Sequence, residues 1–222
     1  DQYIGLQKRN MMSIKIYHIV HVDRLSSILT DGCLWSDAVI SQRTNNGSMI
    51  GLSNIKQRRL HKALNSYPDL HVGDCVPFYF CPRSVMLYLI HRGNTELEYQ
   101  GGQEPIIHLQ ADFNQVITWA NSQNPPVSWV FTSSNAGSNY FEDFNDLNLL
   151  NNKINWSAVN ANYWQDQNIK EGKQAEFLLE NKFPWHLIEH IGVHPSHYTQ
   201  VVNALQGQQH QPQVTIEPTW YY

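Results

Sequence analysis

The sequence predicts an α+β fold built on mixed or antiparallel β-sheets. Strand patterns recur along the whole chain and outnumber helical patterns, and they show no regular strand–helix alternation of the kind that builds a parallel sheet. No internal repeat or linker divides the 222 residues. We therefore expect one domain over residues 14–222, preceded at residues 1–13 by a tag-derived or disordered leader.

The composition excludes several classes of protein. With 41% hydrophobic and 12% aromatic residues the chain can build a globular core, and a net charge of -4 provides no overall attraction to nucleic acid or to a membrane surface. A nucleic-acid role would need a local basic patch. Three cysteines without a CxxC pair predict neither a disulfide framework nor a zinc ribbon, which fits a reducing cytoplasm. No apolar run approaches the ~20 residues that span a bilayer, so no membrane partner is expected.

Strands are expected where β-branched and aromatic residues alternate with polar ones or form short apolar runs. These segments are residues 14–22, 75–81, 106–109, 127–132, 173–180, 189–193 and 213–216. Helical spacing follows the first strand at residues 23–29, with Asp23 as the N-cap and Gly32 as the C-terminal stop.

Further helices are expected at residues 54–64, at 82–90, where Pro82 would open the helix, and at 196–205. The long, Asn-rich region 133–171 carries several aromatic residues and should hold short helices.

Two segments carry charge in an informative way. In the strand 173–180 the apolar residues Ala175, Phe177 and Leu179 fall on one face, and Glu176 falls on the other. An acidic strand face is usually solvated, so the pattern alone leaves Glu176 at the surface unless a cleft covers it. Residues 55–62 form the most basic window, which is either a charged surface helix or a cationic site.

Several familiar sites are set aside. Four histidines between residues 186 and 197 have metal-like spacing, but this stretch is predicted to be a strand and a turn, where they would not converge, so no metal is expected. The chain has no GxGxxG, P-loop or GxSxG motif. Cys81 lies among bulky apolar residues, which indicates a core position rather than a nucleophile.

Six blocks of residues occur in order from position 17 to the end of the chain: YHIVHVD (17–23), IKQRR (55–59), VPFYFCPRS (76–84), YQGGQEPI (99–106), QAE (174–176) and WYY (220–222). Together they resemble the DarT family of DNA-targeting ADP-ribosyltransferase toxins, and most of all its thymidine-directed branch. The third and fourth blocks are specific, whereas QxE alone is weak because it recurs in unrelated chains.

The resemblance implies an ADP-ribosyltransferase-like fold, with a split mixed or antiparallel β core and flanking helices. It also implies that NAD+ is the co-substrate and that ADP-ribose passes to a base, thymine in this branch, in single-stranded DNA while nicotinamide leaves. A macrodomain antitoxin of the DarG type that reverses the mark would be the partner. In this family a NAD-binding element would span about residues 50–61, and a substrate-recognition loop about residues 130–176.

The same resemblance assigns roles to individual residues. Glu176 would be catalytic, because a carboxylate stabilises the oxocarbenium-like charge that develops on the ribose. Arg59 would contact the cofactor, and the resemblance implies that it assists removal of the proton from the acceptor base. Because guanidinium stays protonated, we expect Arg59 to stabilise either the deprotonated base or the diphosphate. The remaining NAD-binding residues implied are His18, Ile19, Val20, Ser27, Trp35, Tyr79, Arg83 and Met86.

On the DNA side, Gln174 would touch the acceptor, and Tyr140, Tyr163 and Trp164 are candidate stacking platforms for bases. Residues 133–137 (SSNAG) lack the charged and histidine residues expected there from the family, which leaves the preferred DNA sequence and the acceptor base open. Two other functions stay open: a transferase that modifies proteins, and an inactive relative that only binds NAD or single strands.

Overall fold

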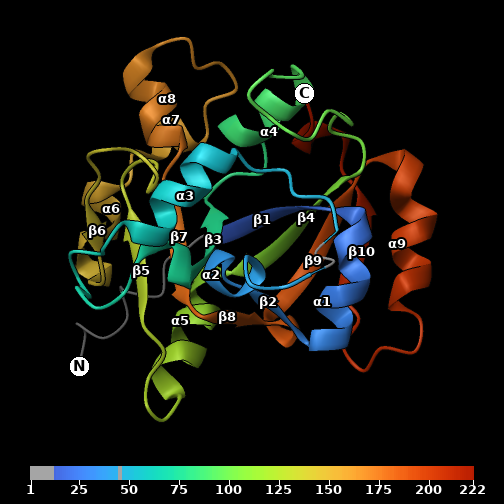
Figure 1. Cartoon of the computed structure of the whole chain (residues 1–222), viewed down its shortest axis with the longest axis horizontal. Coiled ribbons are helices and arrows are strands. Elements are labelled where there is room, and N and C mark those ends of the chain that lie inside the picture. The colour runs from blue at the N-terminus through green and yellow to red at the C-terminus, as the bar shows by residue number, and fades with distance from the viewer. Residues whose placement is uncertain (1–12, 45–46) are drawn as a thin grey trace, which may run out of the picture.

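The structure is a computed structural model and describes residues 13–44 and 47–222. Its centre is a sheet in which eight strands lie in the order β10-β9-β4-β1-β3-β7-β5-β6, and β2 pairs separately with β8 (Figure 1). The strands are β1 Lys15–His21, β2 Cys33–Trp35, β3 Cys75–Tyr79, β4 Ile106–Asp112, β5 Trp129–Thr132, β6 Asp143–Phe144, β7 Glu176–Glu180, β8 Lys182–Pro184, β9 Ile188–Val193 and β10 Gln213–Ile216.

Neighbouring strands are antiparallel except β9 and β10, which are parallel, so the α+β prediction with a mixed sheet is confirmed. The helices are α1 Leu25–Asp31, α2 Asp37–Ile40, α3 Ser53–His61, α4 Val85–His91, α5 Phe113–Ser122, α6 Leu150–Lys153, α7 Trp156–Val159, α8 Gln167–Lys173 and α9 Tyr198–Leu205.

The sheet divides between β1 and β3. Seven residue pairs join β1 to β4 and five join β3 to β7, but β1 and β3 share one registered pair, Tyr17 with Tyr79. Proline is normally confined to strand edges and irregularities, and Pro77 of β3 lies at this division. The two halves of the sheet therefore separate here and leave room between them.

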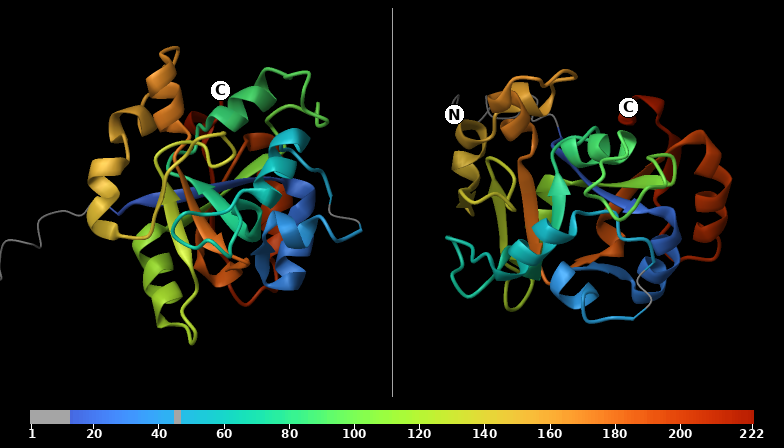
Figure 2. Two further views of the ribbon diagram at one scale, coloured as in Figure 1. Left: turned by 60° about the vertical axis from the view of Figure 1, so that its left-hand side comes forward. Right: turned by 45° about the horizontal axis from the view of Figure 1, so that its top comes forward.

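Helices cover the sheet at both ends. Helices α1 and α9 contact each other beside β9 and β10. On the opposite side α6 lies next to β6, and α7 and α8, which contact each other, lie above it in Figure 1 (see also Figure 2). The largest apolar cluster joins residues of β1, β3, β4, β7 and β9 to α5 and includes Phe78, Phe113 and Phe177. No described helix is long and apolar enough to cross a membrane.

Two predicted helix starts are wrong. Asp23 does not cap α1, which begins at Leu25; its carboxylate instead accepts hydrogen bonds from the backbone N–H and hydroxyl of Ser48. Pro82 does not open α4 either. That helix begins at Val85 because the Ser84 hydroxyl caps it by accepting from the Leu87 N–H. Gly32 does end α1, at a φ of 69° that suits glycine.

The two-faced interpretation of residues 173–180 is also wrong. Strand β7 begins only at Glu176, and Gln174 belongs to the end of α8. Both faces of the strand are covered: Phe177 and Leu179 lie in the main apolar cluster, and Leu178 packs on the other side beside Val130. Covering on both sides is what buries Glu176. Helix α5 was not predicted from the sequence, although Asp112 caps it through the Gln115 N–H.

The predicted leader lies, apart from Ser13, outside the described residues. Two of the histidines with metal-like spacing form hydrogen bonds with neighbouring side chains: His190 with Gln110 and Thr215, and His194 with Ser196. Within the described ranges no group of three or more His, Cys, Asp and Glu side chains could hold a metal ion.

Burial of His108 makes stability depend on pH. The side chain is fully buried on β4, and burial lowers its pKa from 6.5 to about 4. The folded protein therefore takes up this proton at a lower pH than the unfolded chain. The contribution is present above pH 6.5 and is lost as pH falls towards 4, on the order of 3 kcal/mol for a shift of this size.

We expect urea titrations to give a smaller free energy of unfolding at pH 4.5 than at pH 7. The variant H108Q should lose less on acidification, whereas H186Q, at an exposed position, should behave as the wild type. Equal pH dependence in H108Q and the wild type would contradict this origin.

Candidate functional site

A cavity of about 260 Å³ opens at the division of the sheet. Its walls come from β1 and β3 and from α1, α2, α3 and α4, together with the residues that lead into β7. Among the residues implied by the resemblance, those that line it are His18, Ile19, Ser27, Trp35, Arg59, Tyr79, Met86, Gln174 and Glu176. The fold thus brings together residues that are far apart in the sequence.

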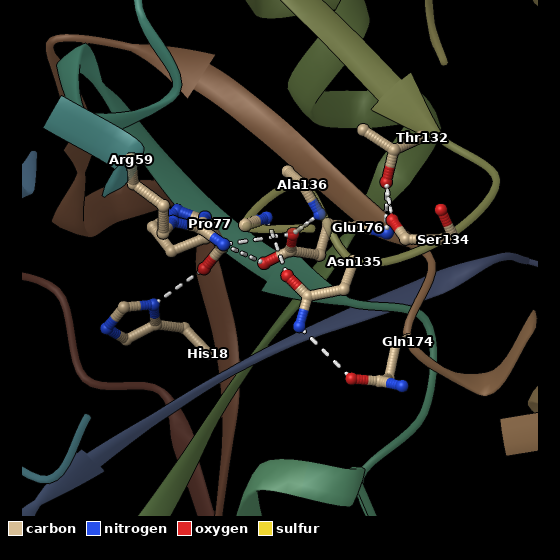
Figure 3. A network of polar contacts seen from close by, with 10 residues as sticks. His18, Arg59, Pro77, Thr132, Ser134, Asn135, Ala136, Gln174 and Glu176 are labelled. Carbon is tan, nitrogen blue, oxygen red and sulfur yellow. Dashed lines mark hydrogen bonds and ion pairs between the residues drawn. The ribbon is translucent and has the colours of Figure 1, made fainter. Parts of the chain in front are cut away.

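Glu176 and Arg59 form a buried ion pair at one end of this cavity (Figure 3). Arg59 Nη1 donates to both carboxylate oxygens, at 3.0 Å and 3.1 Å. Glu176 is 2% exposed and Arg59 7% exposed. Because Glu176 is the first residue of β7 and faces Tyr79 of β3, two elements fix its backbone while α3 supplies the arginine.

The loop after β5 supplies the third contact to Glu176. The Ala136 N–H donates to Glu176 Oε2 at 2.8 Å, and the Glu176 N–H donates to the Thr132 hydroxyl at 3.0 Å. Asn135 Nδ2 donates to Gln174 Oε1 at 3.1 Å, which brings Gln174 to the same loop (Figure 3). The carboxylate is therefore oriented from two sides before any ligand binds.

His18 bridges the two halves of the sheet. Its Nδ1 lies 2.7 Å from the Pro77 carbonyl oxygen, which can only accept, so Nδ1 carries the proton (Figure 3). Burial lowers the pKa of His18 to about 4, helped by the positive charge of Arg24 and opposed by the Pro77 hydrogen bond. A neutral imidazole protonated at Nδ1 leaves Nε2 as an acceptor for a hydroxyl of a ligand.

The electrostatics of the pair keep Arg59 charged. Burial alone would lower its pKa, but the charges of Glu176 and Asp37 outweigh burial and the pKa is raised. Nη2 of Arg59 is buried and has no hydrogen-bond partner among the described residues. One arm of the guanidinium thus holds Glu176, and the other can donate to an incoming oxygen.

Other predicted residues lie outside the cavity. Val20 is buried in the main apolar cluster, and Arg83 stacks on the ring of Tyr222 at 4.3 Å from its centroid. Trp164 packs edge-on against Tyr88 at 4.9 Å. Tyr140 and Tyr163 are 94% and 71% exposed, which is the exposure that a stacking platform needs.

Three further cavity residues were not assigned a role from the sequence, although Lys56 belongs to the basic window 55–62. Arg24, Asp37 and Lys56 line the cavity, and Lys56 Nζ lies 3.5 Å from Asp37 Oδ1. The Ala136 amide was missed for another reason: a backbone N–H is present at every position but proline, so only the folded loop can single it out.

Transfer of ADP-ribose requires a group that stabilises positive charge on a ribose, and this cavity provides the groups that an ADP-ribosyltransferase needs. The Glu176 carboxylate can stabilise positive charge on a ribose, and His18 can hold a ribose hydroxyl. Comparison with known proteins narrows this class. Residues 17–222 match the family described as "ssDNA thymidine ADP-ribosyltransferase, DarT", and the chain belongs to that family.

Curated relatives agree with this membership. A DNA ADP-ribosyl transferase of Thermus aquaticus is 38% identical over 210 residues, which cover 93% of this chain and 88% of the relative. One from Mycobacterium tuberculosis is 26% identical over 183 residues, which cover 79% and 74%.

Solved structures show the same fold. Thermus sp. 2.9 DarT in complex with ADP-ribosylated single-stranded DNA matches with a TM-score of 0.84 and 37% identity, over 95% of this chain and 97% of that one. The same Thermus protein in complex with NAD+ matches with a TM-score of 0.79 and 35% identity, over 95% and 98%. The prediction of a DarT-type ADP-ribosyltransferase fold is confirmed.

The buried pair can be tested by a double-mutant cycle. R59M leaves the Glu176 carboxylate buried with one backbone donor, and we expect it to lower the free energy of unfolding by about 3 kcal/mol or more. R59M/E176Q should lose less than the sum of the two single variants, because neither charge is then left unpaired. Additive losses in urea titrations would show that the two side chains do not interact.

Proposed function

We propose that this protein transfers ADP-ribose from NAD+ to a thymine base in single-stranded DNA and releases nicotinamide, as the toxin of a toxin–antitoxin pair. The observation that carries the proposal is the Glu176 carboxylate, held by Arg59 and the Ala136 amide at the end of a cavity between the two halves of the sheet. Membership of the DarT family supports the choice of NAD+ and of DNA.

Glu176 would act on the nicotinamide ribose. When the glycosidic bond breaks, its electron pair leaves with nicotinamide and positive charge develops on the ribose carbon and ring oxygen. A carboxylate fixed at this point stabilises that charge and accepts a hydrogen bond from the 2′-hydroxyl, worth roughly 3–4 kcal/mol of barrier. Because Arg59 and the Ala136 N–H already orient Glu176, little reorganisation is needed as the charge develops.

His18 would hold another part of the co-substrate. With the proton on Nδ1, its Nε2 can accept a hydrogen bond from a ribose hydroxyl. Ile19, Ser27, Trp35, Tyr79 and Met86 complete the walls of the same cavity. Val20 would contribute only through its backbone, because its side chain is in the core.

Arg59 would act at the acceptor base as a cation. With its pKa raised, Arg59 cannot take the proton of the thymine ring, so that proton would pass to solvent water. Nη2 of Arg59 can then donate to an oxygen of the deprotonated base. The base would then attack the ribose carbon as nicotinamide leaves. Gln174 lies beside Asn135 on the loop and would contact the same base.

The remaining expectations complete the proposal. Residues 14–222 would form one domain, with residues 50–61 as the NAD-binding element and 130–176 as the substrate-recognition loop. The partner would be a DarG-like macrodomain antitoxin, and the protein would act in the cytoplasm.

This chain spans 51% of the Thermosipho africanus DarTG chain solved in complex with ADP-ribose, with a TM-score of 0.71. At 20% identity that likeness concerns the fold alone.

The test of function is a direct comparison of acceptors. The protein is incubated with NAD+ and either a thymine-containing single-stranded oligonucleotide, the same oligonucleotide without thymine, or lysate proteins, and mass spectrometry records the added ADP-ribose. We expect addition to the first acceptor. E176Q should lower nicotinamide release by about 100-fold or more, because one electrostatic group of this kind typically contributes that much.

If ADP-ribose is found on lysate proteins and not on the DNA, the protein is instead a transferase that modifies proteins. Absence of any turnover in the wild type would favour the inactive, binding-only relative.

The exposed Tyr140 provides a second test. If this ring stacks on a base, Y140A should raise the KM for single-stranded DNA by about 5- to 100-fold, as expected for one lost stack. Nicotinamide release in the absence of DNA should not change, because Tyr140 does not line the NAD cavity. Y198A, a partly exposed tyrosine on α9, serves as the matched control. An unchanged KM for Y140A would show that Tyr140 does not stack on a base of the DNA.

A further inference from the structure

The cavity is lined by four cationic side chains, three of which have a carboxylate partner. Arg59 pairs with Glu176 at 3.0 Å, Lys56 with Asp37 at 3.5 Å and Arg43 with Asp31 at 2.5 Å. The fourth, Arg24, has no carboxylate within ion-pair distance among the described residues. Its neighbour Asp23 is engaged by Ser48 and His21 instead.

Arg24 is also poorly solvated. Its Nε is inaccessible to water and has no hydrogen-bond partner in the described part of the chain. Nη1 donates to the Met49 sulfur, a weak acceptor, at 3.8 Å. Burial lowers the pKa of Arg24, and the more distant charges of Asp37 and Asp23 offset this only in part. Burying a guanidinium without an anionic partner costs free energy. A bound anion would offset this cost, so Arg24 is a candidate anion-binding residue.

The position of Arg24 indicates which anion fits. It follows β1 directly, and its charge acts on His18, as does that of Lys56. Arg59, in contrast, is already engaged by Glu176 at the reacting end of the cavity. The negative groups of NAD+ are its two phosphates, and they are separated from the reacting carbon by a ribose.

We propose that Arg24 binds the diphosphate of NAD+ and is the main cationic contact for that group in this cavity. The inference rests on the proposed use of NAD+ and goes beyond it by assigning a residue that the sequence motifs did not single out. Lys56 and Asp37 remain a neutral pair beside it, so the local charge that the diphosphate meets comes from Arg24.

The side chain of Arg24 is held in place for this role. A Cβ added at Gly47 would lie 2.8 Å from Arg24 Cγ and 2.9 Å from an Asp23 carboxylate oxygen. Asp23 accepts hydrogen bonds from the Ser48 N–H and hydroxyl, which fixes the backbone of residues 47–49 against the stem of Arg24. A preoriented guanidinium can present two parallel N–H donors to phosphate oxygens.

The experiment compares ligands that differ in charge. Calorimetry with ADP-ribose, which carries the diphosphate, and with adenosine, which carries no phosphate, is done on wild type, R24Q, R24K and R92Q. We expect R24Q to bind ADP-ribose about 10- to 100-fold more weakly and adenosine unchanged, since one charge-assisted contact is lost. R24K should fall between R24Q and the wild type. R92Q, at an exposed position directly after α4, should bind both ligands as the wild type does.

The outcomes separate this inference from the proposed function. Equal ADP-ribose affinity in R24Q and the wild type would overturn the role of Arg24 and leave the function intact. Failure of the wild type to bind ADP-ribose at all would instead contradict the use of NAD+. If thermal unfolding shows that R24Q is not folded, R24K decides: it must lose affinity for ADP-ribose and not for adenosine, and equal losses for both ligands would overturn the inference.

Discussion

The buried contact between Glu176 and Arg59 is the interaction on which the site depends. It joins α3 to the first residue of β7, the strand that pairs with β3, and the loop after β5 adds the Ala136 N–H to the same carboxylate. Burying two charges is unfavourable unless they are paired and hydrogen-bonded. Glu176, Arg59 and this loop therefore constrain one another, so the cavity exists with its carboxylate already oriented.

The division of the sheet creates the space for this pair. Strands β1 and β3 share one registered residue pair, and the His18 side chain, rather than a continuous ladder, links them through the Pro77 carbonyl. That hydrogen bond also places the proton of His18 on Nδ1 and leaves Nε2 as the nitrogen that can accept a hydrogen bond. Within the cavity Arg59 bonds Glu176, whereas the charge of Arg24 acts on His18. In the function that we propose, the two cations would therefore contact different parts of NAD+.

Much of the fold could be predicted from the sequence, because alternation and β-branched residues mark strands such as Lys15–His21 and Gln213–Ile216 reliably. Glu176 could not be placed by its pattern. An acidic residue opposite Phe177 and Leu179 suggests a solvated face, and only the neighbours β3, β5 and α3 bury it. The resemblance of short blocks to a family indicated its role. Arg24 could not be singled out from the sequence at all. That its buried Nε has no hydrogen-bond partner among the described residues depends on the side chains around it in the folded chain.

The most direct test of the central claim is a crystal structure of this protein with a non-hydrolysable NAD+ analogue. We expect a Glu176 carboxylate oxygen at about 2.6–3.0 Å from the 2′-hydroxyl of the nicotinamide ribose, with Arg59 still bonded to Glu176. A nicotinamide ribose bound away from Glu176, or a Glu176 side chain turned out of the cavity in the complex, would contradict the account.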